Sequence, residues 1–101
     1  LDVDKVIAAI SGGAAGSWQL SNLGPRIIEG DFEPGFMVHL QQKDLKLVLQ
    51  AANDVKLALP GVSLVHQFFN IVERAGCAEE GTQALIKAYE NQAGKQARVK
   101  K

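Results

Sequence analysis

The longest stretch of the sequence without glycine or proline contains residues 36–55, and this stretch constrains the fold most strongly. Its composition favours an α-helix. At about 100° per residue its polar side chains gather on one narrow stripe, and most of the remaining circumference is apolar. The stripe consists of His39, Lys43, Lys46, Gln50, Asn53 and Asp54. A helix with so much apolar surface is expected at the centre of the domain.

Asp44 interrupts the apolar part of this helix. It projects among apolar side chains of the same segment, namely Met37, Leu40, Leu47, Val48 and Ala51. A carboxylate in such surroundings costs free energy unless it is paired or hydrogen-bonded. We therefore expect Asp44 to be buried against backbone N–H groups at a helix start or against a cation such as Arg26. Lys43 lies at the border between the polar stripe and the apolar wall, and any chemistry of the chain is expected near that border.

Two helical segments precede the central one. Residues 2–11 predict a short helix, with an aspartate as its N-cap and a glycine as its stop. The apolar residues of segment 17–29 also fit one helical face, with Ser17 as the N-cap and Trp18 in the core. Pro25 predicts a kink in this segment, or two short helices, because a proline removes a hydrogen bond and clashes with the preceding turn.

Two further helices are expected after the central one. An extended linker at 57–61 leads into a helix at 62–75, where His66 is expected to be a structural histidine. The last helix covers residues 83–91, and residues 93–101 form a basic, solvated tail. No stretch alternates between apolar and polar residues as a strand does, so the sequence predicts an all-α domain of about five helices.

Composition excludes several classes of function. Eleven basic and eleven acidic residues cancel, so no net charge draws the chain to nucleic acid or to an anionic membrane. No apolar run approaches the roughly 20 residues that span a bilayer. The single cysteine, Cys77, excludes an internal disulfide and gives no metal cluster, which suits a reducing compartment such as the cytoplasm.

Three linked stretches carry a resemblance to a known family. They are S-G-G-A-A-G-S-W-Q-L at 11–20, D-F-E-P-G-F at 31–36 with K-D-L seven residues after Phe36, and Leu59-Pro60 with Ala75-Gly76 and Ala84-Leu85. In this order and spacing, residues 1–92 resemble the C-terminal domain of the β-hydroxyacid dehydrogenases. That family includes 3-hydroxyisobutyrate dehydrogenase and tartronate semialdehyde reductase. The resemblance implies the all-helical fold of the 6-phosphogluconate dehydrogenase C-terminal type.

The resemblance also implies that the chain is a piece of a two-domain NAD(P)-dependent oxidoreductase. An N-terminal Rossmann domain would bind most of the NAD or NADP, and the helical domain would close the cleft and form a homo-oligomer. The substrate would be a small hydroxy acid or semialdehyde acid. The family's general acid/base lysine would lie upstream of Leu1, so the fragment alone would be inactive.

Site residues follow from the same motifs. Lys43 matches the family's K-D-L lysine, which contacts the nicotinamide end of the cofactor, and Phe36 lines the same cleft. Seven residues apart, these two are expected on similar sides of the helix. Asp44 would support the cleft, and Ser17 and Trp18 would face the region between the domains.

The chain departs from the family pattern before its last helix. Gly81 and Gln83 stand where the family often carries aspartate and serine, which changes the expected capping of that helix. The alternative to a dehydrogenase domain is a non-catalytic helical interaction module. In that case Lys43 and Lys46 belong to a solvated stripe, and Asp44 is a core carboxylate that caps a neighbouring helix.

Overall fold

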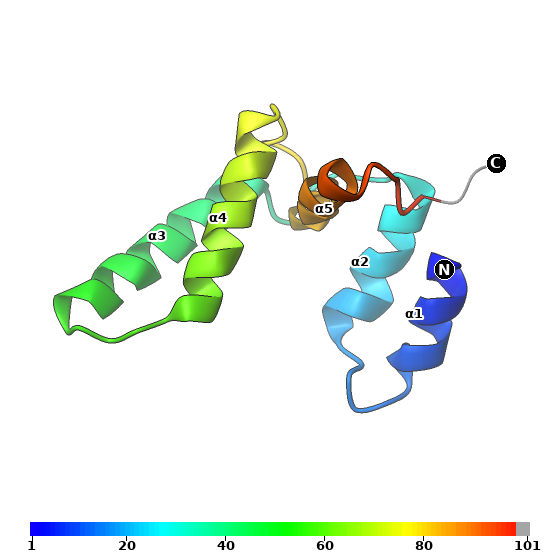
Figure 1. Ribbon diagram of the computed structural model, residues 1–101, viewed down its shortest axis with the longest axis horizontal. Helices are drawn as coiled ribbons and strands as arrows, with labels where there is room; N and C mark the ends of the chain where they lie inside the picture. The colour runs from blue at the N-terminus through cyan, green and yellow to red at the C-terminus, as the bar shows by residue number, and fades with distance from the viewer. Residues whose placement is uncertain (99–101) are drawn as a thin grey trace.

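The computed structural model describes residues 1–98 and is all-helical, which confirms the predicted fold class (Figure 1). Within this part of the chain the one β-type pairing is an isolated antiparallel bridge between Met37 and Gly81. None of the described helices is both long and apolar enough to span a bilayer. In chain order the elements are α1 (Val3–Ser11), α2 (Trp18–Glu29), α3 (Val38–Asp54), α4 (Pro60–Arg74), the 3₁₀ helix η1 (Thr82–Leu85) and α5 (Ile86–Ala93).

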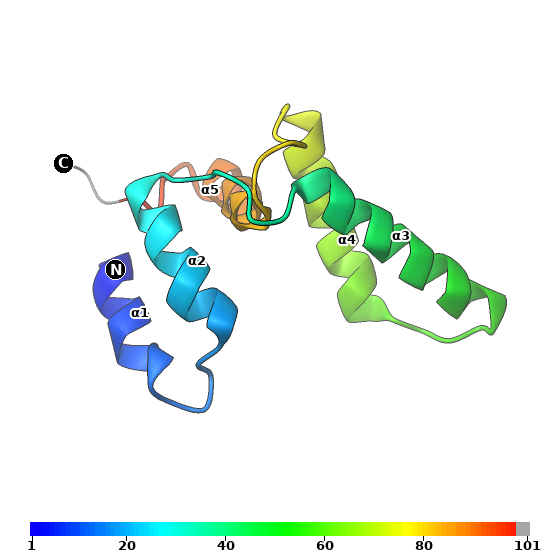
Figure 2. The ribbon, with the colours of Figure 1, turned by 180° about the vertical axis from the view of Figure 1, so that it is seen from behind.

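The helices form two hairpins joined by a central pair of elements. α1 packs on α2, and α3 packs on α4. η1 contacts α2, α3 and α4, and α5 packs on α4, so the η1–α5 segment lies between the hairpins (Figures 1 and 2). The result is an open arrangement that measures 47 × 33 × 25 Å.

The hydrophobic core lies where the second hairpin meets the central elements. Its buried members come from α3, α4, η1 and α5: Val38, Phe69, Val72, Ala84 and Ala88. The first hairpin is much less buried, since α1 has no buried residue and α2 buries only Gly24 and Ile28. The core therefore holds α3 and α4 firmly, and η1 ties the first hairpin to them.

α2 is one continuous helix, so of the two outcomes predicted for Pro25, a kink or two short helices, the second was wrong. Ser17 caps it as expected, because its side chain accepts a hydrogen bond from the Leu20 N–H at 3.0 Å. Pro25 lies inside the helix on the exposed side. The adjacent Gly24 has a packing role, because a Cβ added there would come within 2.9 Å of Ile7 Cδ1 on α1. The Gly-Pro pair thus brings the two helices of the hairpin close together.

α4 begins two residues earlier than predicted, at Pro60. A proline is favourable at the first helical position, where its missing N–H would have no partner within the helix. The predicted linker is correspondingly shorter.

At the other end of the chain α5 continues to Ala93, and the Ala97 N–H donates to Glu90 Oε2 at 2.7 Å. Arg98 also pairs with Glu90, whereas a solvated tail was expected, and residues 99–101 lie outside the described part.

α3 has two distinct apolar faces. The inner face packs on α4 and consists of Val38, Gln42, Leu45, Leu49 and Ala52. Gln42 is only 1% exposed, and its Nε2 donates to Asn70 Oδ1 and to the His66 carbonyl at 2.9 and 3.3 Å. Its Oε1 lies 2.9 Å from His66 Nδ1. An amide oxygen only accepts, so His66 carries its proton on Nδ1 and is the structural histidine that was predicted.

The outer face of α3 is open to solvent, against the expectation of a helix buried on nearly all sides. This face consists of Leu40, Asp44, Leu47, Val48, Ala51 and Val55, all of them exposed. Leu47, for example, keeps 56% of its surface exposed. A row of apolar side chains on a helix usually indicates that another element packs on it. Among the described residues, α4 packs on the inner face of α3, and no element packs on the outer face.

Candidate functional site

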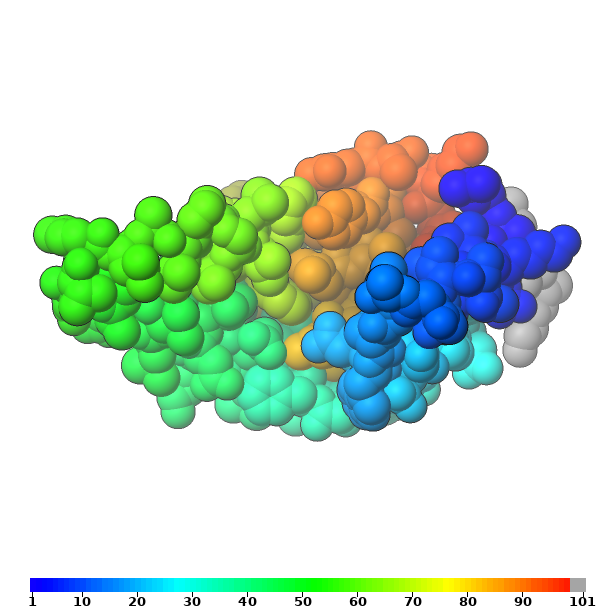
Figure 3. Space-filling model, turned by 90° about the horizontal axis from the view of Figure 1, so that it is seen from below, coloured from blue at the N-terminus to red at the C-terminus, as the bar shows by residue number. Residues whose placement is uncertain are grey.

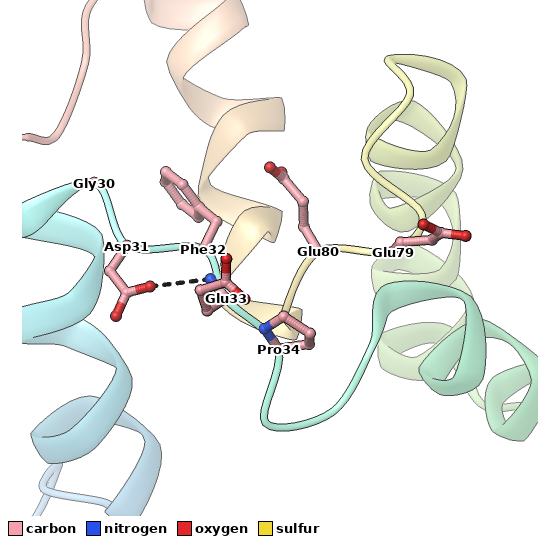
Figure 4. A pocket seen from close by; sticks show the side chains of 7 residues that line it. All are labelled: Gly30, Asp31, Phe32, Glu33, Pro34, Glu79 and Glu80. Carbon is pink, nitrogen blue, oxygen red and sulfur yellow. Dashed lines mark hydrogen bonds between the residues drawn. The ribbon is translucent and has the colours of Figure 1, made fainter.

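The turn at residues 30–36 connects α2 to α3 and carries the D-F-E-P-G-F motif. Arg26 Nε donates to Asp31 Oδ2 at 3.0 Å, and the same guanidinium donates to the Glu33 carbonyl at 2.6 Å. The Glu33 N–H donates to Asp31 Oδ1 at 3.0 Å, the bond dashed in Figure 4. The Arg26 hydrogen bond, followed by that of the Glu33 N–H, lowers the pKa of Asp31 below its usual value. The first half of the turn is thus a closed polar network.

The aromatic ring of this turn, Phe32, has two cations close to it. Lys87 Nζ is 4.2 Å from the ring centroid and Arg98 Cζ is 5.0 Å from it. Lys87 also donates to Glu80, at 2.5 and 2.9 Å from its two oxygens, and lies 3.8 Å from Cys77 Sγ. Partial burial acts to raise the pKa of Glu80, but the hydrogen bonds from Lys87 and Cys77 outweigh it and lower that pKa. Burial raises the pKa of the Cys77 thiol, which disfavours the nucleophilic thiolate.

A shallow pocket of about 370 Å³ lies between the turn and the segment before η1 (Figure 4). Its lining is rich in carboxylates and comprises Gly30, Asp31, Phe32, Glu33, Pro34, Glu79 and Glu80. Within residues 1–98 no group of three or more His, Cys, Asp or Glu side chains is placed to hold a metal ion. Asp31 and Glu80 are paired with cations, but Glu33 and Glu79 add negative charge, which repels an anionic dinucleotide and makes this pocket a poor cofactor site.

Phe36 ends the turn, and the structure corrects its expected position. α3 begins at Val38 with Met37 as its extended N-cap, so Phe36 precedes the helix instead of lying on it. The argument that Phe36 and Lys43 are two helical turns apart therefore fails. The Phe36 ring is 42% exposed, and its carbonyl accepts a hydrogen bond from the Thr82 N–H at 3.0 Å.

The start of α3 is held by the loop that precedes η1. Met37 makes no side-chain cap, but the N–H groups of Val38 and His39 donate to the carbonyls of Glu80 and Ala78, both at 2.9 Å. These two N–H groups would otherwise have no partner within the helix. The turn and the first residues of α3 are therefore fixed to the same 78–82 segment.

Lys43 and Asp44 are both exposed, Asp44 on the outer face of α3 and Lys43 at the edge between that face and the polar stripe. The predicted burial of Asp44 was wrong, and so was Arg26 as its partner, because Arg26 binds Asp31. The physical reason is that the apolar side chains around Asp44 belong to the uncovered outer face. In this chain the carboxylate is solvated, which removes the cost that had required a partner.

Ser17 and Trp18 lie at the start of α2, in the other hairpin. Trp18 is 70% exposed, so its predicted place in the core was wrong. Ser17 lies on the rim of a groove of about 540 Å³ between the hairpins, on the side seen in Figure 3, with η1 and α5 between them. Largely apolar side chains line this groove, including Leu20, Leu23, Ile27, Val65, Phe69, Leu85, Ile86 and Tyr89. The structure thus places Ser17 across from α4, while Phe36, Lys43, Asp44 and Trp18 are not among the lining residues.

The roles of three polar side chains that organise the site were missed from the sequence. Gln42 could have been found, because it falls on the same helical face as Val38 and Leu45. Arg26 lies in α2 and Asp31 lies five residues later, beyond the end of that helix, so helical periodicity does not predict their ion pair. Gln83 lies 5% exposed beneath the turn, about fifty residues away from the carbonyls it binds.

Comparison with known proteins identifies the family. Residues 1–89 match the family model described as NAD-binding of NADP-dependent 3-hydroxyisobutyrate dehydrogenase. The chain belongs to this dehydrogenase family. The match confirms the resemblance drawn from the D-F-E-P-G-F and K-D-L motifs, and its description agrees with NAD or NADP as the family's cofactor.

Individual relatives agree with this assignment. An uncharacterized oxidoreductase of Synechocystis sp. is 49% identical over 86 residues, which make up 85% of this chain and 29% of the relative. The 2-hydroxy-3-oxopropionate reductase of Escherichia coli is 38% identical over 89 residues, 88% of this chain and 30% of the relative. The crystal structure of 3-hydroxyisobutyrate dehydrogenase from Salmonella typhimurium superposes with a TM-score of 0.81 at 29% identity, over 86% of this chain and 30% of that one. The chain thus spans about 30% of the length of these relatives.

Proposed function

We propose that residues 1–92 are the helical domain of an NAD(P)-dependent oxidoreductase that acts on a small hydroxy acid or semialdehyde acid. The observation that carries this proposal is the family match over residues 1–89. The names of two relatives, 3-hydroxyisobutyrate dehydrogenase and 2-hydroxy-3-oxopropionate reductase, suggest 3-hydroxyisobutyrate and 2-hydroxy-3-oxopropionate as examples of the substrate class. Both molecules are small carboxylates with a hydroxyl or carbonyl group that a nicotinamide can oxidise or reduce.

The cofactor would be held mainly by an N-terminal Rossmann domain of the same protein. The family's general acid/base lysine would also lie upstream of Leu1. Bound nicotinamide would supply the hydride transfer, and the protein would orient the reactants and supply the electrostatics. On this proposal the helical domain contributes one wall of the cleft, and the outer face of α3 is that wall.

Lys43 and Phe36 would meet the nicotinamide end of the cofactor. The Lys43 ammonium is exposed at the edge of the outer face, where it can donate hydrogen bonds to cofactor oxygens and attract a carboxylate substrate. The half-exposed Phe36 ring gives a flat apolar contact at the start of the same helix. Asp44 would line the cleft between the leucines of the outer face, and Ser17 and Trp18 would face the interdomain region from α2.

A homo-oligomer would use apolar surface outside the cleft. α4 exposes Leu64 and Ile71, seven residues apart, and Phe68 lies between them in sequence. The Phe68 ring stacks on the half-exposed Tyr89 ring of α5, with centroids 4.9 Å apart. This stripe supports self-association through α4. Sedimentation of the full-length protein at micromolar concentration would show a dimer or larger assembly, and a monomer would refute this part of the proposal.

Calorimetric titration with NAD and NADP tests whether cofactor binding requires the Rossmann domain. We expect the 101-residue chain alone to bind either cofactor weakly, with no measurable turnover of hydroxy acids. The full-length protein is expected to bind one of the two cofactors at micromolar concentration and to oxidise a small hydroxy acid. Micromolar binding by the isolated chain would contradict the proposed role of the Rossmann domain, and a full-length protein without turnover would contradict the proposed function.

A further inference from the structure

A buried amide fixes the turn that carries Phe36. Gln83 of η1 is 5% exposed, and its Nε2 donates to the Asp31 carbonyl at 3.2 Å and to the Glu33 carbonyl at 3.0 Å. Arg26 of α2 donates to the same Glu33 carbonyl from another element. The Glu33 carbonyl oxygen thus accepts hydrogen bonds from two side chains, Arg26 and Gln83, that are far apart in the sequence.

Gly81 provides the space that this amide occupies. A Cβ added at Gly81 would lie 2.3 Å from Gln83 Oε1 and 2.8 Å from Gln83 Cδ, so close that the Gln83 amide, the end of a flexible side chain, would have to shift. The backbone of Gly81 has φ −67° and ψ 159°, a conformation that any residue adopts. Glycine here leaves room for the amide in its observed position and does not serve backbone freedom, so Gly81 and Gln83 act as a pair.

The same short segment also holds both ends of the turn through its backbone. The Gly81 N–H donates to the Phe32 carbonyl at 2.8 Å, and the Thr82 N–H donates to the Phe36 carbonyl at 3.0 Å. The Phe36 ring is half exposed and is not part of the core cluster. With so little packing of its own, the ring takes its position from the backbone of the turn.

We infer that Gln83, with Gly81 leaving room for it, is a positioning residue for the cofactor end of the proposed cleft. It holds the turn so that the Phe36 ring is presented at one place, next to the start of α3. This inference rests on the proposed function, because Phe36 contacts the nicotinamide only if that proposal is right. Gln83 itself touches neither cofactor nor substrate.

The test is steady-state kinetics of the full-length oxidoreductase carrying Gln83→Met, which keeps the length of the side chain but removes the donor. Assays are run well below the unfolding midpoint of each variant, so that every enzyme molecule is folded. We expect KM for the nicotinamide cofactor to rise about five-fold with kcat within two-fold, since a contact made equally in ground and transition states is weakened. Loss of stability alone would leave KM unchanged. The exposed Gln92 of α5 supplies the matched control, and Gln92→Met is expected to change neither constant.

Gly81→Ala is the second variant, because it leaves every hydrogen-bonding group in the protein and only displaces the Gln83 amide. It is expected to raise KM to the same extent, and the double variant is expected to be no worse than either single one. It also carries the test if Gln83→Met does not fold. An active wild type whose variants keep the wild-type KM, or lose kcat alone, would overturn this inference and leave the proposed function standing. A wild type without nicotinamide-dependent turnover would overturn both.

Discussion

The two apolar faces of α3 differ in what covers them. The inner face is packed against α4, and its one polar member, Gln42, has partners for both ends of its amide. The outer face is equally apolar in composition, yet Leu47 is half exposed and Asp44 lies in solvent among its leucines. The difference shows which apolar surface of α3 is buried within this chain and which is left exposed. The inner face belongs to the fold of the domain, and the outer face is the one available for another domain or a cofactor.

Adjacent alanines allow the sharpest test of this comparison. Ala52 is buried on the inner face and Ala51 is exposed on the outer face. We expect Ala52→Asp to lower the free energy of unfolding by about 3–5 kcal/mol, because it leaves a carboxylate buried without a partner. Ala51→Asp is the control, and in the 101-residue chain it is expected to change stability by no more than about 0.5 kcal/mol. Urea denaturation measures both, and equal losses would mean that the two faces are equally buried.

Removing the inner-face amide comes next in size. Gln42→Leu keeps the volume roughly constant but leaves His66 Nδ1 and Asn70 Oδ1 without their partner. We expect a loss of about 1–3 kcal/mol, the cost of leaving such groups unsatisfied. Gln50→Leu on the exposed polar stripe is the matched control and is expected to be near neutral. Thermal unfolding of the two variants side by side gives the comparison, and a Gln42→Leu variant as stable as wild type would refute the role of this network.

Asp44 probes the outer face directly. Because its carboxylate is exposed, Asp44→Ala is expected to change the stability of the 101-residue chain by no more than about 0.5 kcal/mol. If the outer face lines a cleft, the same substitution in the full-length enzyme is expected to lower activity. A large loss of stability in the isolated chain, measured by thermal unfolding, would show that Asp44 has a partner within the domain after all.

The pH dependence of stability gives the smallest effect, and it concerns the turn. The pKa of Asp31 is lowered in the folded state by the hydrogen bonds of Arg26 and the Glu33 N–H. A depressed folded pKa means that this contribution is present above the unfolded value, about 3.9, and is lost as the pH falls through the folded value. Denaturation midpoints recorded between pH 7 and pH 2 are therefore expected to fall less steeply below pH 4 for Asp31→Asn. An unchanged slope would show that the ion pair contributes nothing.

How far the sequence predicts this molecule depends on the range of the interactions. Helix positions follow from local signals such as the Ser17 cap and the Gly12 stop, so all five helices were found with ends shifted by up to three residues. The largest shift is at α5, which begins at Ile86 because the residues before it form the 3₁₀ helix η1. Which apolar face is covered is not a local property, and this is why Asp44 and Trp18 were wrongly placed in the interior. Gln83 is the extreme case, because its amide binds carbonyls 50 and 52 residues earlier in the chain. Motif spacing identified the family, but contacts between residues so far apart in the sequence are visible only in the folded structure.

The central claim is that the outer side of α3 forms the cofactor end of a dehydrogenase cleft, and Lys43 tests it most directly. The measurement is kcat/KM of the full-length enzyme with Lys43→Ala beside Lys46→Ala, a neighbouring exposed lysine on the polar stripe. We expect Lys43→Ala to cost about 1.5–3 kcal/mol of transition-state stabilisation, roughly 10- to 150-fold in kcat/KM, with unfolding unchanged. Lys46→Ala is expected to be near neutral. If both variants keep the wild-type kcat/KM, Lys43 is an ordinary surface lysine and the outer side of α3 does not meet the cofactor.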